Sequence, residues 1–352
     1  MNRRVHYIDN LRWITVSLLI VYHAGIAYNT WGEANYIFFE PVRPIAGIVS
    51  WISPWFMPLM FLLAGVSARY SLQKRSVGAF IRERFLRLGI PLAFGMLVIN
   101  PILSYVADVT HNGYTGDVFQ HYGVFFTRFT DLTGYDGGFT LGHFWFIAVL
   151  ILISLLACPV IRGLEALRER SGENVLRIVM LLLAALAVAT FDIRFFGKQV
   201  ILYFCVYLLG YFFFSERDYT AKLAKGKWVF VLLFLITATL NVILFIYVQD
   251  YETLNTVCNY AAFVFGIPAL VCLGHDYLDR ANSLTTFNSR ISYVFYIVHF
   301  PVVVLCQYFL SLTGMSSILN FVVTLVITYP LVYGLCYLIE KIKFTRILFG
   351  MK

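Results

Sequence analysis

Charged residues are scarce in this sequence, and their scarcity excludes an ordinary soluble fold. Asp, Glu, Lys and Arg together make up 13% of the 352 residues, whereas hydrophobic residues make up 60%. Soluble domains carry about 25% charged residues, and a single soluble core of this length would not need so little charge. The composition therefore predicts a membrane protein.

Paired cysteines are also lacking. None of the six cysteines forms a CxxC pair, and all six lie in or beside apolar segments. This arrangement supports neither a disulfide framework nor a zinc site. We also expect no bound cofactor. A small-residue cleavage site is missing after the first apolar segment, although Arg3 and Arg4 precede it, so we expect no cleavable signal.

Ten apolar segments have roughly the length of a membrane-spanning helix. They cover residues 11–29, 44–68, 88–107, 143–161, 177–191, 199–215, 228–248, 255–274, 291–310 and 318–339. No tandem repeat or appended soluble region is visible between them. The pattern predicts an all-α, polytopic membrane protein of about ten transmembrane helices, with residues 1–352 forming a single domain in the cell membrane.

The basic residues lie in the loops between these segments, and loops rich in Lys and Arg alternate with loops that have few. If the N-terminus is cytoplasmic, 22 of the 27 Lys and Arg residues fall on the cytoplasmic side, 4 fall outside, and Arg12 stands at the edge of the first apolar segment. Cytoplasmic loops carry such an excess of Lys and Arg, and one missed span would invert every later loop. We therefore expect both termini in the cytoplasm. The net charge of +8 is then explained by orientation and lipid contact rather than by nucleic-acid binding.

The first apolar segment carries an acid, an arginine and a histidine. Arg12 and His23 are eleven residues apart, which on an α-helix is about three full turns, so both project from one face, about 16 Å apart. Asp9 lies one turn before Arg12. A titratable side chain as deep as His23 is costly in a membrane, which favours a functional role; the alternative is a neutral histidine that packs against a neighbouring helix.

Two further histidines lie in apolar segments. His143 is followed by Trp145 in GHFWF, and His299 follows Tyr296 in YIVHFP. Tyr296 and His299 are three residues apart and share a helix face, and Pro301 should free a backbone carbonyl nearby. No two of the histidines have ligand spacing on one helix, and no Cys or carboxylate accompanies them, so a metal site is not expected.

A basic stretch follows the second apolar segment. Arg84 and Arg87 alternate with apolar residues before Pro91, which predicts an amphipathic helix at the cytoplasmic face. A spacing of three residues lets two guanidinium groups converge on one anion. The alternative is that these arginines only anchor and orient the chain.

Residues 109–142 form the one long loop, predicted to lie outside. The loop is rich in Gly, Tyr and Asp, a mixture that suits sugar stacking and hydrogen bonds to hydroxyl groups. Long loops are often functional covers, and the alternative is a plain solvated connection.

These residues resemble the motifs of the acyltransferase 3 family of integral membrane acyltransferases, and the resemblance runs along the whole chain. Five motifs carry it, in the family's order: Arg12 and His23 preceded by Asp9; Phe61 to Gly65, where Ala64 stands in place of the usual Ser; Arg84 and Arg87 with Pro91; His143, Trp145 and Phe146; and Tyr296, His299 and Pro301. Within the family the chain is similar to the branch that includes glucan-succinylating proteins.

The resemblance implies transfer of an acyl group, often acetyl or succinyl, onto extracytoplasmic glycans or other hydroxyl acceptors. Such transfer needs a base with a pKa near 7, and His23 and His143 are the expected catalytic residues. The donor would be acyl-CoA, made in the cytoplasm, with Arg12, Arg84 and Arg87 on its phosphates and Asp9 holding Arg12.

Three aromatic or polar residues complete the expected site. Trp145, Tyr296 and His299 are expected to bind substrate, and Trp145 would also help to exclude water. Membrane lipids are the other expected partners. The alternative function is a transporter of small polar molecules without chemistry, although paired inverted halves with interrupted helices are not visible.

Overall fold

A computed structural model describes residues 5–351 of the chain. Arg3, Arg4 and Lys352, which contribute to the cytoplasmic charge count, lie outside the described residues. Within them every regular element is a helix, with one isolated bridge between Phe195 and Lys198 and no β-strand. The predicted all-α class is therefore confirmed.

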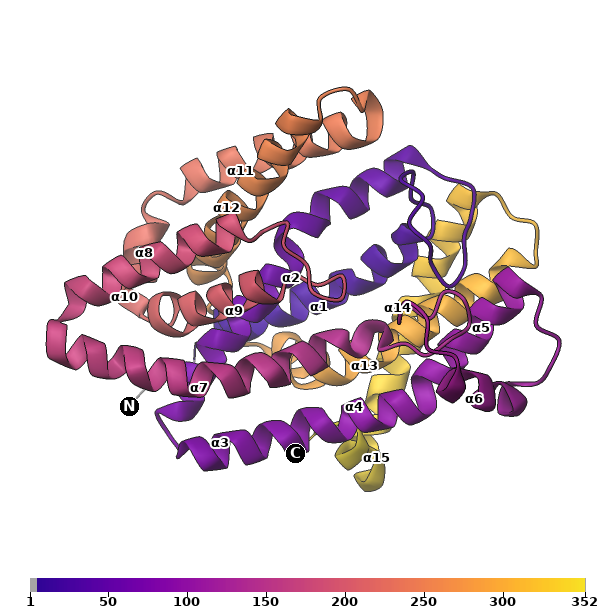
Figure 1. Cartoon of the computed structure of the whole chain (residues 1–352), viewed down its shortest axis with the longest axis horizontal. Helices are drawn as coiled ribbons and strands as arrows, with labels where there is room; N and C mark the ends of the chain where they lie inside the picture. The colour runs from indigo at the N-terminus through magenta and orange to yellow at the C-terminus, as the bar shows by residue number, and fades with distance from the viewer. Residues whose placement is uncertain (1–4, 352) are drawn as a thin grey trace. The chain divides into compact units, whose positions relative to one another are not determined.

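Fifteen α-helices run through residues 5–351 (Figure 1). They are α1 His6–Ile26, α2 Arg43–Leu72, α3 Val77–Arg84, α4 Ile90–Phe94, α5 Asn100–Asn112, α6 Val118–Thr127, α7 Trp145–Ser171, α8 Glu173–Ala189, α9 Val200–Leu209, α10 Arg217–Ala224, α11 Lys227–Val242, α12 Glu252–Tyr277, α13 Ser283–Ser311, α14 Ser317–Lys341 and α15 Lys343–Leu348. Each of the ten predicted spans coincides with helix.

Seven helices between residues 5 and 351 are long and apolar enough to cross a membrane. An eighth is obtained if Val200–Phe214 and Arg217–Ala224, which are bent by 93°, count as one span. The predicted count of ten also used α1, which carries Asp9, Arg12 and His23, and α8, which has only 17 residues. The structure thus supports a multi-pass membrane protein.

The basic stretch around Arg84 is not a separate surface helix. Residues Val77–Asn112 form one helical run of 36 residues, in which α3 passes directly into a π-helical turn at Phe85–Gly89 and then into α4. The alternation of Arg with apolar residues resembles an amphipathic helix, but Pro91 stands in the first turn of α4, where proline is tolerated. The helix therefore continues through the proline.

The chain divides into two compact units, each built from separate stretches. Unit 1 contains the residues up to Thr15, Ser50–Phe85 and Val149–Ser289; unit 2 contains Val16–Val49, Leu86–Ala148 and Arg290–Lys352. The expectation of a single domain stays a prediction.

In unit 1, two glycines let α2 and α9 approach closely. A Cβ at Gly65 would overlap the carbonyl of Tyr207, and a Cβ at Gly210, directly after α9, would overlap the carbonyl of Leu62. Small residues at helix interfaces let two backbones approach closely. In lipid the hydrophobic effect does not drive helices together, so this close packing stabilises their association instead. Nearby, the rings of Phe61 and Tyr203 stack at 4.4 Å.

In unit 2, hydrogen bonds join the second half of α1 to α13 and α14. The side chain of Gln307 donates to the Ala24 carbonyl at 2.9 Å, and the Tyr329 hydroxyl donates to the Ser17 carbonyl at 2.8 Å. These bonds hold the stretch of α1 that carries His23.

The long segment 109–142, also in unit 2, is not loop throughout. It contains α6, which begins with a capping box between Asp117 and Gln120. Asp108, buried at the end of α5, accepts hydrogen bonds from His121 at 3.1 Å and from Arg128 at 3.2 Å. One buried carboxylate of α5 therefore ties both ends of α6 to α5.

Candidate active site

Three histidines from three helices of unit 2 gather around Phe300. The ring centroid of Phe300 lies 4.3 Å from that of His23 and 5.3 Å from that of His143. His299 lies 5.3 Å from His23 and 5.5 Å from His143, between ring centroids. The structure thus brings together His23, His143 and His299, which we call the histidine cluster.

The proton position on His143 follows from its hydrogen bond. Its Nε2 lies 2.9 Å from the carbonyl oxygen of Ile297. A carbonyl only accepts, so Nε2 carries the hydrogen, and in the neutral ring Nδ1 keeps a lone pair. Nδ1 is buried and has no hydrogen-bond partner among residues 5–351.

His299 has the opposite tautomer for the same reason. Its Nδ1 lies 2.6 Å from the carbonyl oxygen of Tyr296 and 3.2 Å from that of Phe295, so Nδ1 carries the hydrogen. Nε2 then keeps the lone pair, and within the described residues no group donates a hydrogen bond to it. The cluster therefore contains two buried lone pairs fixed by backbone carbonyls.

The three rings differ in accessibility. His143 is 4% exposed and His299 is 0% exposed, whereas His23 is half-buried. His23 is thus the member of the cluster that a substrate can most readily reach.

Tyr296 connects the two helices that carry the buried histidines. Its hydroxyl donates to the carbonyl of His143, while His143 donates to Ile297 in the opposite direction. Tyr296 also packs against the Phe146 ring at 5.5 Å. Trp145 lies half-buried next to Phe146, at 6.4 Å between ring centroids. Tyr296 therefore helps to fix the geometry of the cluster through a direct hydrogen bond, whereas Trp145 contacts Phe146.

Gly142 and Asn100 set the position of His143. Gly142 has φ of +48°, a conformation that disfavours other residues, and a Cβ there would lie 3.0 Å from the Asn100 amide oxygen. Asn100 donates to the Thr140 carbonyl at 2.9 Å. The chain turns tightly at this point, passes through the 3-10 turn Gly142–Phe144 that holds His143, and enters α7 at Trp145.

Sequence reasoning missed two aromatic residues beside the cluster, Phe300 and Tyr36, and Tyr135, which packs against Tyr36. Phe300 contacts two of its histidines, and its place between His299 and Pro301 was the only signal. Tyr36 is buried, lies 5.5 Å from Phe300 and 5.1 Å from Tyr135, and donates to the Thr133 carbonyl at 3.2 Å. No sequence pattern marked Tyr36, because it approaches through the turn after α1.

Arg12 is held in place in unit 1. Its guanidinium pairs with Asp9 at 3.1 Å and donates to the Ser67 hydroxyl at 2.5 Å. Ser67 in turn donates to the Leu63 carbonyl at 2.8 Å. Ser67, two residues after Gly65, is a hydroxyl that the sequence analysis did not single out, and it stands close to the motif in which Ala64 replaces the usual Ser.

Arg84 and Arg87 have different surroundings. The half-buried Arg84 guanidinium lies 4.8 Å from the centroid of the Phe80 ring, in unit 1. The exposed Arg87, in unit 2, donates through Nε to the Gly350 carbonyl at 3.4 Å. Arg87 stands in the π-helical turn, where residues three apart do not align as in an α-helix. Their convergence on one anion stays a prediction.

Comparison with known families assigns the chain. The model of the acyltransferase 3 family, described as an acyltransferase domain, matches residues 5–341, nearly the whole sequence. No curated protein and no solved structure matches the chain. The match and the apolar helices agree with an enzyme that crosses the membrane several times. The chain belongs to the acyltransferase 3 family and is a membrane acyltransferase.

Proposed function

We propose that this protein moves an acyl group of the acetyl or succinyl class from acyl-CoA to a hydroxyl group of an extracytoplasmic glycan or similar acceptor. The observation that carries the proposal is the histidine cluster around Phe300, with two backbone-fixed lone pairs beside a half-buried imidazole. Transfer from a thioester to a hydroxyl requires a base, and imidazole is suited to that task.

His23 is the base in this proposal. It accepts the proton of the acceptor hydroxyl as the oxygen attacks the thioester carbonyl, and the tetrahedral intermediate then collapses with release of the CoA thiolate. The thiolate takes up the proton, which restores neutral His23. The half-buried position of His23 supports this role, because a base must contact the acceptor. His143, with its bare Nδ1, is the second catalytic histidine.

His299, Tyr296 and Phe300 shape the cluster, with Tyr296 and His299 also in range of the substrate. Trp145 and Phe146 add apolar bulk that limits hydrolysis of the thioester by water. Tyr36 and Tyr135 extend the aromatic surface, and Tyr135 belongs to the segment 109–142, which we propose covers the acceptor. Aromatic faces and hydroxyl groups together suit a sugar.

The donor side of the proposal uses the arginines. Arg12, held by Asp9 and Ser67, is a fixed cation that suits a CoA phosphate. Arg84 and Arg87 are the further candidates for phosphate contact. Acyl-CoA is a cytoplasmic metabolite, so this arrangement goes with cytoplasmic termini, about ten spans and the cell membrane as location, as the distribution of Lys and Arg favours.

An acyl-transfer assay tests the function. Purified protein is incubated with radiolabelled acetyl-CoA or succinyl-CoA, with and without a glycan acceptor, and label in the glycan is counted. We expect transfer that depends on the acceptor and is lost in His23→Ala. An absence of transfer to every hydroxyl acceptor tried, by protein that still binds acyl-CoA, would argue for a different acceptor chemistry.

A further inference from the structure

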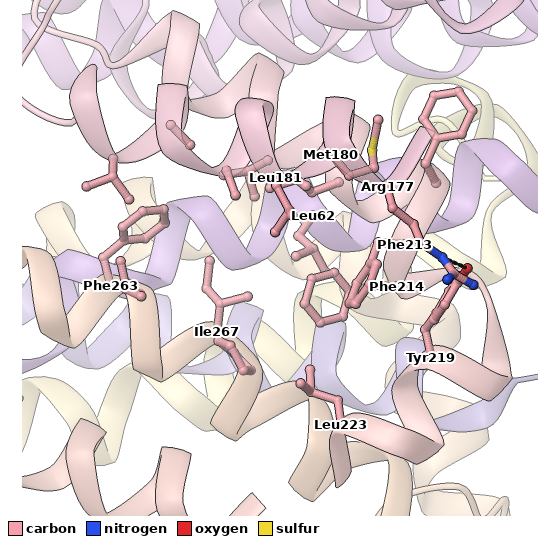
Figure 2. A pocket seen from close by; sticks show the side chains of 18 of the residues that line it. Leu62, Arg177, Met180, Leu181, Phe213, Phe214, Tyr219, Leu223, Phe263 and Ile267 are labelled. Atoms are coloured by element: carbon pink, nitrogen blue, oxygen red, sulfur yellow. Dashed lines mark hydrogen bonds between the residues drawn. The ribbon is translucent and has the colours of Figure 1, made fainter. Parts of the chain in front are cut away.

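Unit 1 contains an apolar groove that the proposed chemistry does not use. Its volume is about 510 Å³, within the range of small-molecule sites. The walls come from α8, α9, the π-helical turn Gly210–Phe214, α10, α11 and α12, and Leu62 of α2 also lines the groove. Met180, Leu181, Phe263 and Ile267 are among the lining residues (Figure 2). Apart from one end, the lining residues are aliphatic or aromatic.

The polar end holds three interacting side chains. In Figure 2, Arg177 and Tyr219 meet at one end of the groove, and Phe263 lines the opposite end. Arg177 Nε donates to the Tyr219 hydroxyl at 3.1 Å, and that hydroxyl donates to Glu173 at 2.9 Å. The groove is therefore polar at one end and apolar along the rest of its length.

The charge at this end is positive. Glu173 pairs with Arg168 at 2.7 Å and accepts from Tyr219 with its other oxygen, so both carboxylate oxygens are engaged. Arg177 is exposed, and it forms no ion pair with a carboxylate among residues 5–351. Its guanidinium uses Nε on Tyr219 and one Nη on Asn174 at 3.4 Å, which leaves further N–H donors for an anion.

The groove is also accessible from the outer surface of α8. Leu181 lines it and is 70% exposed, and Ile178, Leu182 and Leu186 on the same helix are exposed as well. Exposed leucines on a helix of a membrane protein face acyl chains rather than water. An occupant can therefore enter from the bilayer, with its apolar part leading.

We propose that this groove binds one acyl chain of an anionic membrane phospholipid, with the lipid phosphate at Arg177. The apolar walls match the chain, and the guanidinium without a carboxylate partner matches the phosphate. A zwitterionic lipid with the same acyl chains binds more weakly, because the positive charge of its headgroup is repelled by Arg177 and Arg168.

Lipid binding to the purified protein tests the proposal. Thermal unfolding in detergent is followed with added phosphatidylglycerol, with phosphatidylcholine of the same chains, and with glycerol phosphate. A ligand that binds only the folded state raises Tm. We expect phosphatidylglycerol to raise Tm most, phosphatidylcholine less, and glycerol phosphate not at all. Equal shifts for the two lipids would overturn the role of Arg177, and a shift with glycerol phosphate would show an anion site without the chain.

Two variants with matched controls locate the site. Arg177→Gln should weaken phosphatidylglycerol binding about 10-fold and remove the preference over phosphatidylcholine, while Arg170→Gln, at an exposed arginine of α7, should change neither. Ala184→Trp fills the groove and should abolish the Tm shift. Leu182→Trp adds the same ring on an exposed face of α8 and should retain the shift. Equal effects of Ala184→Trp and Leu182→Trp would overturn the site.

A third measurement needs no variant. A phosphatidylglycerol with a diazirine at the end of one chain is photolysed on the wild-type protein, and labelled peptides are mapped. We expect label on the α8 and α12 residues that line the groove, Met180 and Phe263 among them. Label spread evenly over exposed helix faces would contradict the proposal. No readout depends on acyl transfer, so this result and the acyltransferase assay fail or succeed separately.

Discussion

His143 donates a hydrogen bond of 2.9 Å from Nε2 to the backbone carbonyl of Ile297. In an unbroken α-helix that carbonyl would accept from the backbone nitrogen of the residue four positions later, which is Pro301. Proline has no N–H, so the carbonyl is left for the imidazole. A proline in α13 thereby fixes the tautomer of a histidine on another helix and leaves Nδ1 as its basic nitrogen.

Replacing Pro301 by alanine should disturb this arrangement. Pro301→Ala supplies a backbone N–H that competes with His143 for the Ile297 carbonyl, so His143 loses its fixed tautomer. We expect kcat for acyl transfer to fall about 10-fold, about 1.4 kcal/mol in the barrier, with KM for acyl-CoA little changed. Steady-state kinetics measures kcat and KM of the variant. Pro330→Ala in α14, another proline inside a helix, is the control and should retain activity.

The histidine variants rank the members of the cluster. His23→Ala should remove acyl transfer, and His143→Ala should lower it next most, because general-base catalysis contributes about 10²–10⁴-fold. His275→Ala, at a half-buried histidine of unit 1, is the control and should stay near wild type. The measurement is initial rate at saturating acyl-CoA. Activity of His23→Ala within a few-fold of wild type would move the base to His143 or His299.

The segment 109–142 should become less stable in mild acid. Burial, opposed by Asp108, lowers the pKa of His121 below the ordinary value of 6.5. Folding keeps His121 neutral, so the unfolded segment binds the proton more readily. The stabilisation is fully present above pH 6.5 and declines as the pH falls toward the lowered pKa.

Hydrogen exchange measures this effect. Protection of residues 109–142, corrected for intrinsic rates, should decrease between about pH 7.5 and about pH 5.5. His121→Gln should weaken the pH dependence. Protection that increases on acidification would show that the interaction with Asp108 outweighs burial.

The donor arginines give a prediction about binding. Arg84→Ala and Arg87→Ala should each weaken acyl-CoA binding about 10-fold or more, with a smaller loss for Lys, since a charge-assisted bond is worth about 1.5–3 kcal/mol. Calorimetric titration into correctly inserted protein measures the affinity. Arg82→Ala, an exposed arginine of α3, is the control. If both arginines only anchor the chain, insertion falls and the affinity of the remaining protein is normal.

The distribution of Lys and Arg predicts the orientation. Reporter fusions at Glu33, Asp136 and Tyr251 should report the outside, and a fusion at Lys225 should report the cytoplasm. The measurement is the activity of a compartment-specific reporter. A cytoplasmic signal at Asp136 would invalidate the ten-span arrangement.

The sequence by itself determined the membrane class, the helical segments and the family. Apolar length and scarce charge act locally along the chain, so each predicted span coincides with helix. The motifs also identified His23, His143 and His299 as candidates, and the lack of an N–H at Pro301 indicated a freed carbonyl. The same local rules counted α1 and α8 as spans, whereas seven helices of residues 5–351, or eight with the bent pair, are long and apolar enough to cross a membrane, so the count of ten stays a prediction.

Only the tertiary structure decided how these residues meet. The freed carbonyl of Ile297 accepts a hydrogen bond from His143, and Phe300 lies against His23 and His143. Both contacts depend on helices that are distant in the sequence. Ser67 on Arg12, Tyr36 beside Phe300 and the groove that ends at Arg177 are likewise products of packing. Periodicity states which face of a helix is apolar, but the identity of the neighbour on that face is fixed by interhelical contacts.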